Sequence, residues 1–293
     1  MKMRRKPQKN TEQRAALLFL APSLVGTVLF WLLPFAETMR RSVCDALGKQ
    51  FVGLANYQSV VQNTAFRLAV RNTARFICTC VPLLLLLSLG LALALRAIRS
   101  KANPRKGSTF KTSFLLPMAI PVASVVVLWQ VLFAKSGLLN TILLALGGQA
   151  VDFMGTGAAF WVLILTYLWK NSGYDMILWL SGLDGISQDL YEAAAVDGAG
   201  AWRRFWAITL PNLLPTLVLT GILSLLNTFK AFREAYLVAG AYPHESMYLL
   251  QHLFNNWFLA LDLPRLSAAA VLVGAVLLCL ILPLQKFWTG EQR

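Results

Sequence analysis

Two groups of polar side chains interrupt strongly apolar stretches of this chain. The first is Trp169-Lys-Asn-Ser-Gly-Tyr-Asp175, and the second lies between Asn227 and Glu234. Amides, carboxylates and cations donate and accept hydrogen bonds, while aromatic rings stack on C–H faces, so this combination suits a polyhydroxylated ligand. We therefore predict a ligand pathway formed by Asn171, Tyr174, Asp175, Asn227, Phe229, Lys230, Arg233 and Glu234.

The same residues also admit a purely structural interpretation. Charges at membrane depth are costly and pair with one another or face a cavity. Asp175 could pair with Lys170 or with another helix, and Lys230 could pair with Glu234 one helical turn away. The sequence leaves both interpretations open.

The composition places these groups in a membrane protein. Hydrophobic residues make up 57% of the chain and charged residues 14%, against about 25% charge in soluble domains. A helix of roughly 20 apolar residues crosses a bilayer core, and no alternating pattern of a barrel is present, so we expect an all-α, polytopic protein with about six transmembrane helices. The predicted spans are Ala15–Ala36, Phe76–Leu95, Thr112–Ala134, Ala158–Leu183, Phe205–Phe229 and Leu266–Leu284.

The net charge of +14 is placed beside the spans. Basic residues cluster before the first span (positions 2–14) and between the second and third (positions 96–111), which is the positive-inside pattern with a cytoplasmic N-terminus. Basic residues between positions 40 and 75 oppose this pattern, but they lie in a long loop. The charge therefore indicates a membrane protein and not a nucleic-acid-binding one.

Motifs of bond-making chemistry are missing from the sequence. It has no phosphate-binding Gly-x-x-x-x-Gly-Lys-Ser/Thr loop, no Gly-x-Ser-x-Gly elbow and no His-Glu-x-x-His helix. The four cysteines and two histidines form no metal-spaced cluster. We expect no catalytic residue, no cofactor and no metal on this chain.

A polar segment from Tyr191 to Pro211 separates the fourth and fifth predicted spans. Asp189 and Glu192 have the spacing of a reciprocal helix cap, and the alanines after them favour helix. Gly198 and Gly200 can end that helix. A second short helix is expected over Ala201–Ile208. This small helix pair has an alanine-rich face that permits close approach by a partner.

The segment resembles the Glu-Ala-Ala loop of binding-protein-dependent ABC importer permeases. The matching positions are Glu192, Ala193, Ala194, Asp197, Gly198, Ala199, Phe205, Ile208, Leu210 and Pro211. Phe51–Tyr57, Asn72-Thr73 and Gly137–Asn140 further resemble the carbohydrate-uptake, maltose-type class. The sequence departs from the pattern at Gly240–Pro243 and at Ser187, where a proline is common.

The resemblance implies a permease subunit that moves a sugar or oligosaccharide inward by alternating access. Glu192, Ala193, Ala194, Asp197 and Gly198 would form the coupling loop (about 184–212) that docks on a separate ATPase. Expected partners are a second, different permease (a heterodimer), two ATPase subunits that bind the ATP, an extracytoplasmic solute-binding protein and membrane lipid. The location would be a bacterial-type cytoplasmic membrane. A tail (1–14), one permease domain (15–288) and a short C-terminal tail (289–293) complete the prediction.

Two other classes of function remain as alternatives. An ion-coupled secondary transporter would use Lys170 and Asp175 as its coupling pair. An integral-membrane enzyme would need a reactive cluster, which the sequence does not provide. Within the importer interpretation, a polyol or glycerol-phosphate cargo is an alternative to a sugar.

Overall fold

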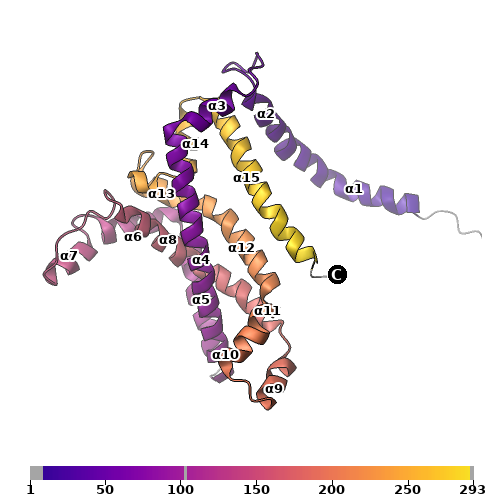
Figure 1. Cartoon of the computed structure of the whole chain (residues 1–293), viewed down its shortest axis with the longest axis vertical. Helices are drawn as coiled ribbons and strands as arrows, with labels where there is room; N and C mark the ends of the chain where they lie inside the picture. Colours follow the sequence, from indigo (N-terminus) through magenta and orange to yellow (C-terminus); the bar gives the residue numbers. More distant parts are fainter. Residues whose placement is uncertain (1–8, 102–103, 291–293) are drawn as a thin grey trace, which may run out of the picture. The chain divides into compact units, whose positions relative to one another are not determined.

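The computed structural model describes residues 9–101 and 104–290. Within these ranges the side chains of 9–15, 99–101, 104–109, 230, 232, 234, 238, 239 and 284–290 lie outside the description. The described residues form helices and one isolated β-bridge between Cys44 and Phe51 (Figure 1). The all-α prediction is confirmed. Two compact units divide the chain: residues 1–63 with 257–276, and residues 64–256 with 277–293.

The first unit contains a long apolar helical segment and a loop fastened by side chains. α1 (Lys9–Thr27), a π-turn (Val28–Leu32) and α2 (Leu33–Ser42) follow one another without a break, and α3 is Ala55–Gln62. Asn56 Nδ2 donates to the carbonyls of Ser42 (3.0 Å) and Cys44 (2.8 Å), and the Tyr57 hydroxyl bonds Ser42 Oγ at 2.7 Å. The Phe51–Tyr57 motif therefore closes the loop that follows α2.

The second unit is built around α4 (Thr64–Lys101) and α8 (Ala158–Asp184). These two helices pack against each other more extensively than any other pair of elements in the described part of the chain. Its other helices are α5 (Pro104–Ala119), α6 (Val122–Phe133), α7 (Leu138–Ala145), α9 (Gln188–Val196), α10 (Ala201–Arg204), α11 (Leu210–Asn212), α12 (Leu214–Thr228) and α13 (Phe232–Ala239). A π-turn (Phe205–Thr209) joins α10 to α11, and 3₁₀ turns cover Phe229–Ala231 and Glu245–Met247. α14 (Leu250–Leu259) and α15 (Leu263–Gly290) each pass from one unit into the other.

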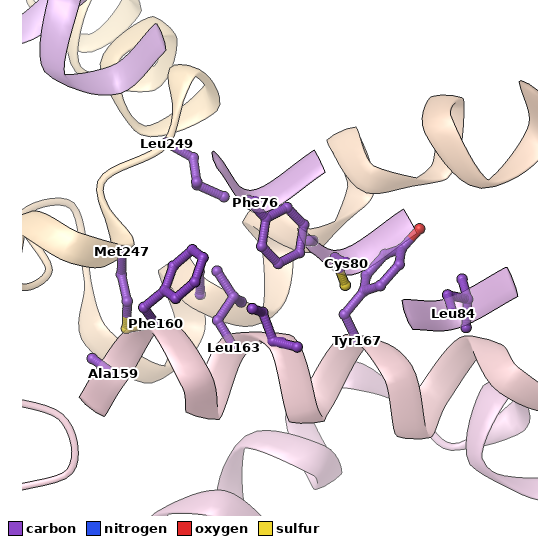
Figure 2. Close-up of a cluster of buried hydrophobic side chains, with 12 residues drawn as sticks. Phe76, Cys80, Leu84, Ala159, Phe160, Leu163, Tyr167, Met247 and Leu249 are labelled. Carbon is purple, nitrogen blue, oxygen red and sulfur yellow. The ribbon is translucent and has the colours of Figure 1, made fainter. Parts of the chain in front are cut away.

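The core of the second unit comes from one face of each long helix. Phe76, Cys80 and Leu84 are spaced by four along α4 and meet Phe160, Leu163 and Tyr167 of α8, with Met247 and Leu249 beside them (Figure 2). The Phe76 and Tyr167 rings are 5.6 Å apart at 78°, an edge-to-face arrangement that stabilises beyond simple burial.

Polar side chains near the start of α4 hold the segment before α14. Asn72 Nδ2 donates to the carbonyls of Glu245 (2.5 Å) and Tyr248 (3.1 Å), while Thr73 Oγ1 accepts from the Leu250 amide at 3.0 Å. Thr73 thus satisfies an amide at the N-terminus of α14, which has no intrahelical partner. The Asn72-Thr73 motif therefore has a structural role in this unit.

Glycines let α8 approach its neighbours closely. A Cβ at Gly173 would collide with the backbone carbonyl of Phe114 in α5, and one at Gly182 would collide with Thr216 in α12. α8 continues through Gly173 as one helix from Ala158 to Asp184. The glycine serves helix packing.

Four helical segments are long and apolar enough to cross a membrane: Ala16–Ser42, Thr64–Ile98, Val122–Ala145 and Leu263–Pro283. A fifth is possible if Ala201–Asn212 and Leu214–Thr228, bent by 64°, count as one span. The prediction of a membrane protein is confirmed, whereas the count of about six spans remains a prediction.

Two predicted spans are wrong as continuous helices. The run Thr112–Ala134 breaks before Val122, because Pro121 adopts a non-helical ψ of 140° and a proline restricts the residue before it. The run Phe205–Phe229 belongs to two helical segments that bend between Asn212 and Leu214, where Pro211 and Pro215 each lack an amide donor.

We predict that Gly173→Ala lowers the thermal unfolding midpoint and the folded yield in detergent, because α5 and α8 must separate to admit the methyl group. The matched control is Gly221→Ala in α12, where the new Cβ would meet only Leu85 Cδ1 at 3.9 Å. That change should be neutral or stabilising by about 0.5–1 kcal/mol, as expected for glycine replaced by alanine in a helix. Equal midpoints for the two variants would contradict the close packing.

Candidate functional site

The polar loop between α8 and α12 begins with a capped helix. The side chain of Ser187 accepts a hydrogen bond from the Asp189 amide at 3.3 Å, and Ser187 has an extended ψ of 134°. Ser187 is therefore the N-cap, and the prediction that Asp189 caps this helix is wrong by two residues. Asp189 lies in the first turn, where its charge is favourable beside the helix N-terminus.

α9 ends in a Schellman motif centred on Gly198. The Ala199 amide donates to the Ala194 carbonyl (2.9 Å) and the Gly198 amide to that of Ala195 (3.1 Å). Gly198 has a φ of 74°, which is unfavourable for residues with a Cβ. A Cβ there would meet no atom within 4 Å, so the backbone conformation alone requires glycine.

The second half of the loop differs from the prediction. A helix was expected over Ala201–Ile208, but α10 covers only Ala201–Arg204 and a wider π-turn follows up to Thr209. Pro211 has no amide to continue a regular hydrogen-bond ladder, and the Leu210 amide bonds the Phe205 carbonyl five residues back. π-turns of this kind often occur at functional sites.

One face of the loop is fixed to the helix bundle. The Tyr191 hydroxyl bonds Thr209 Oγ1 at 2.9 Å, which joins α9 to the π-turn, and the Arg96 guanidinium of α4 lies 5.2 Å from the Tyr191 ring. Tyr191 and Ile208 also pack on the cluster that contains Leu95. The loop is therefore attached to α4 as well as to the two helices that it connects.

The opposite face of the loop is open. Glu192, Ala193, Asp197 and Gly198 are exposed, and Ala194 is half-buried. Of the loop residues proposed to dock a partner, all but Ala194 are thus on the surface.

An aromatic group on the same loop was not among the predicted site residues. Trp202 is 74% exposed, and its ring lies 6.3 Å from Phe205 and 5.7 Å from Trp206. The sequence held one signal for it: two tryptophans four apart within a short segment that also carries Arg203 and Arg204.

A cavity of about 170 Å³ lies among the helices of the second unit. Its walls come from α5, α6, α8, α12, the 3₁₀ turn and α13, through Met118, Val122, Tyr167, Lys170, Asn171, Asn227, Ala231 and Arg233. The structure therefore brings together three of the predicted pathway residues: Asn171, Asn227 and Arg233. This volume is more than ten times the roughly 10–15 Å³ that one water molecule needs. The cavity is therefore large enough for a small solute.

The other predicted pathway residues lie elsewhere. Tyr174 and Phe229 are half-buried and do not line the cavity. The side chains of Lys230 and Glu234 lie outside the described part of the chain.

Asp175 belongs to a buried polar connection between α8 and α12. Ser224 Oγ donates to Asp175 Oδ2 at 2.6 Å, and the Tyr167 hydroxyl donates to the Ser224 carbonyl at 3.2 Å. Asp175 and Ser224 are each 1% exposed, so this carboxylate faces α12 and not the cavity. Lys170, in contrast, lines the cavity.

Comparison with known proteins identifies the class. A family model described as "Binding-protein-dependent transport system inner membrane component" matches residues 87–285. The chain is 29% identical to the lactose transport system permease protein LacF of Rhizobium radiobacter over 94% of each chain. It is 32% identical to the trehalose/maltose transport system permease protein MalF of Thermococcus litoralis over 92% of each.

Solved structures show the same fold. A bacterial ABC transporter involved in the import of the acidic polysaccharide alginate contains a chain with a TM-score of 0.83 at 22% identity, covering 97% of this chain and 99% of that one.

These matches define a membrane permease of the importer type. The chain belongs to the binding-protein-dependent transport system inner membrane component family, so the predicted resemblance is confirmed. It is a transporter subunit and not an enzyme. The alternative of an ion-coupled secondary transporter is not favoured.

We predict that Ser224→Ala destabilises the protein by about 1–3 kcal/mol, because the buried Asp175 carboxylate loses its donor. The control is Thr220→Val, one turn earlier in α12, where a buried hydroxyl has no hydrogen-bond partner among the residues that the structure describes. Removing that hydroxyl should be neutral or stabilising. Thermal unfolding of both variants in one detergent compares them, and a larger loss for Thr220→Val would refute the assignment.

A further prediction concerns the end of α9. In Gly198→Val the left-handed conformation should cost about 1–2 kcal/mol, so the Ala199 amide should exchange its hydrogen about 5–30-fold faster. Gly200→Ala is the matched control, because Gly200 has a φ of −64° and open space around it. Hydrogen exchange followed by mass spectrometry measures both, and unchanged protection in Gly198→Val would contradict the role of this glycine.

Proposed function

We propose that this permease carries a sugar or oligosaccharide inward, driven by ATP that separate ATPase chains bind and hydrolyse. The observation that carries the proposal is the family match over residues 87–285, a range that includes both the loop and the cavity. The cargoes in the names of the relatives, lactose and trehalose or maltose, support a carbohydrate.

The loop is the proposed docking site for the ATPase. Glu192, Ala193, Ala194, Asp197 and Gly198 supply the contact surface, in which small side chains permit close approach and Glu192 provides a charge. Because Tyr191 is held by Thr209 and Arg96, a force on the exposed face reaches the bundle instead of bending the loop.

The connectivity links docking to transport. The loop joins α8 directly to the helical segment that ends in α12, and these two helices carry cavity residues Asn171 and Asn227. The hydrogen bonds among Tyr167, Ser224 and Asp175 tie α8 to α12. We infer that the pair moves as one body when the loop is displaced, which changes the cavity wall relative to α6.

The pathway residues follow from that arrangement. Asn171, Asn227 and Arg233 would contact the cargo, together with Lys170. Asp175 would act through helix packing, and Tyr174, Phe229, Lys230 and Glu234 remain candidates for other states of the transport cycle.

The assembly is proposed by family analogy. It comprises this chain, a second and different permease, two ATPase subunits and an extracytoplasmic solute-binding protein, in a bacterial-type cytoplasmic membrane with the N-terminus in the cytoplasm. No cofactor is expected on this chain.

Glu192→Ala should reduce recovery of the ATPase with the tagged permease and abolish ATP-dependent uptake, because the loop loses its charged contact. Glu192→Gln removes the negative charge but keeps the size of the side chain, so it shows whether the charge itself is needed. Glu245→Gln, which alters an exposed carboxylate in the 3₁₀ turn before α14, is the control. Mass spectrometry of complexes purified in mild detergent measures the partners.

Unchanged ATPase recovery with Glu192→Ala would exclude the docking role. Uptake that persists without the ATPase but collapses with an uncoupler would exclude the importer function altogether.

A further inference from the structure

The cavity in the second unit has cations on its wall. Lys170 and Arg233 line it, and none of the lining residues whose side chains the structure describes is acidic. The Asp175 carboxylate does not line the cavity, because it accepts a hydrogen bond from Ser224 at the contact between α8 and α12. Within the described part of the wall, Arg233 therefore has no acidic residue beside it.

Of the two cationic side chains that line the cavity, Arg233 is the better placed to bind a ligand. Its side chain is exposed, and among the side chains that the structure describes no carboxylate forms an ion pair with it. Lys170 takes part in a further interaction, so Arg233 is the stronger candidate. A guanidinium presents a planar fork of N–H donors that fits the two oxygens of a carboxylate, phosphate or sulfonate.

The other residues that line the cavity suit the hydroxylated part of a small solute. Asn171 uses Nδ2 to donate to the Tyr167 carbonyl at 2.8 Å, and its amide oxygen is an acceptor for hydroxyl groups. Met118 and Val122 supply an apolar side. Among the described lining residues Tyr167 is the only aromatic, so these residues offer limited stacking on sugar rings and charge must contribute much of the recognition.

We propose that this cavity binds an anionic, hydroxylated solute, such as a sugar acid or sugar phosphate, with Arg233 holding the anionic group. The proposal rests on the transport function above and narrows its cargo. Neutral sugars of the same size would bind more weakly, because they cannot form the ion pair with Arg233.

The test is equilibrium binding to the intact, detergent-purified transporter complex without its solute-binding protein. Two matched probe pairs are galacturonate with galactose and glucose 6-phosphate with glucose. We expect the anion of at least one pair to bind at least tenfold more tightly than its neutral partner, with a preference that falls as salt rises.

Arg233→Gln should abolish that preference, because the ion pair with the anionic group is lost. Arg233→Lys should keep part of it, since the charge remains but the fork is lost. Arg71→Gln, which changes an exposed arginine of α4 outside both the cavity and the coupling loop, is the control and should match the wild type. Recovery of the ATPase with each variant checks that the complex is assembled.

Equal binding within both pairs, an unchanged preference in Arg233→Gln, or no binding of any probe would overturn the proposal. The proposed function has a separate readout. If a neutral sugar is taken up with ATP and without preference for anions, the importer function stands and the anionic cargo is excluded. If no ATPase is recovered with the wild-type chain, the importer function fails whichever probe binds.

Discussion

The burial of polar side chains in the middle of α8, an otherwise apolar helix, is the constraint on which the rest of the second unit depends. α8 carries Lys170, Asn171 and Asp175 in its middle, and an unpaired charge there would be costly. Asp175 is consequently bonded to Ser224. Trp179 donates to Ser88 of α4 at 3.0 Å, and Gly173 and Gly182 bring α5 and α12 close. α4, α5 and α12 are thus each held to α8 by a specific contact as well as by apolar packing.

That packing gives the loop and the cavity a common support. The loop begins at the end of α8, is held to α4 through Arg96 and Tyr191, and leads into α12. The cavity lies farther along the same two helices, where Asn171 and Asn227 face it. The proposed docking surface and the cavity are therefore supported by one pair of helices.

Much of the fold and of the loop could be predicted from sequence, because both depend on local signals. The position of the loop, the glycine that ends α9 and the start of α8 follow from capping, from glycine conformation and from hydropathy. The breaks at Pro121 and between α11 and α12 do not follow from hydropathy, because the apolar runs continue through them.

The candidate site was harder to predict. The structure places Asn171, Asn227 and Arg233 at a cavity, whereas their role in a transport pathway stays a prediction. Nothing local in the sequence distinguishes Asn171 from Asp175, which lies one turn away and does not line the cavity. The difference comes from Ser224, which is 49 residues distant along the chain. The exposed face of the loop is likewise a tertiary property, since Tyr191 faces the bundle only because Thr209 and Arg96 lie opposite it.

The central claim is that α8 and α12 move as one body when ATP is bound. Pulsed electron paramagnetic resonance on the reconstituted complex measures this directly, with spin labels at Leu165 and Leu219 on the exposed sides of α8 and α12, or at Val127 of α6 and Leu226 of α12. The account predicts a constant distance for the first pair and a changed distance for the second when ATP is added. A changed α8–α12 distance with a constant α6–α12 distance would contradict it.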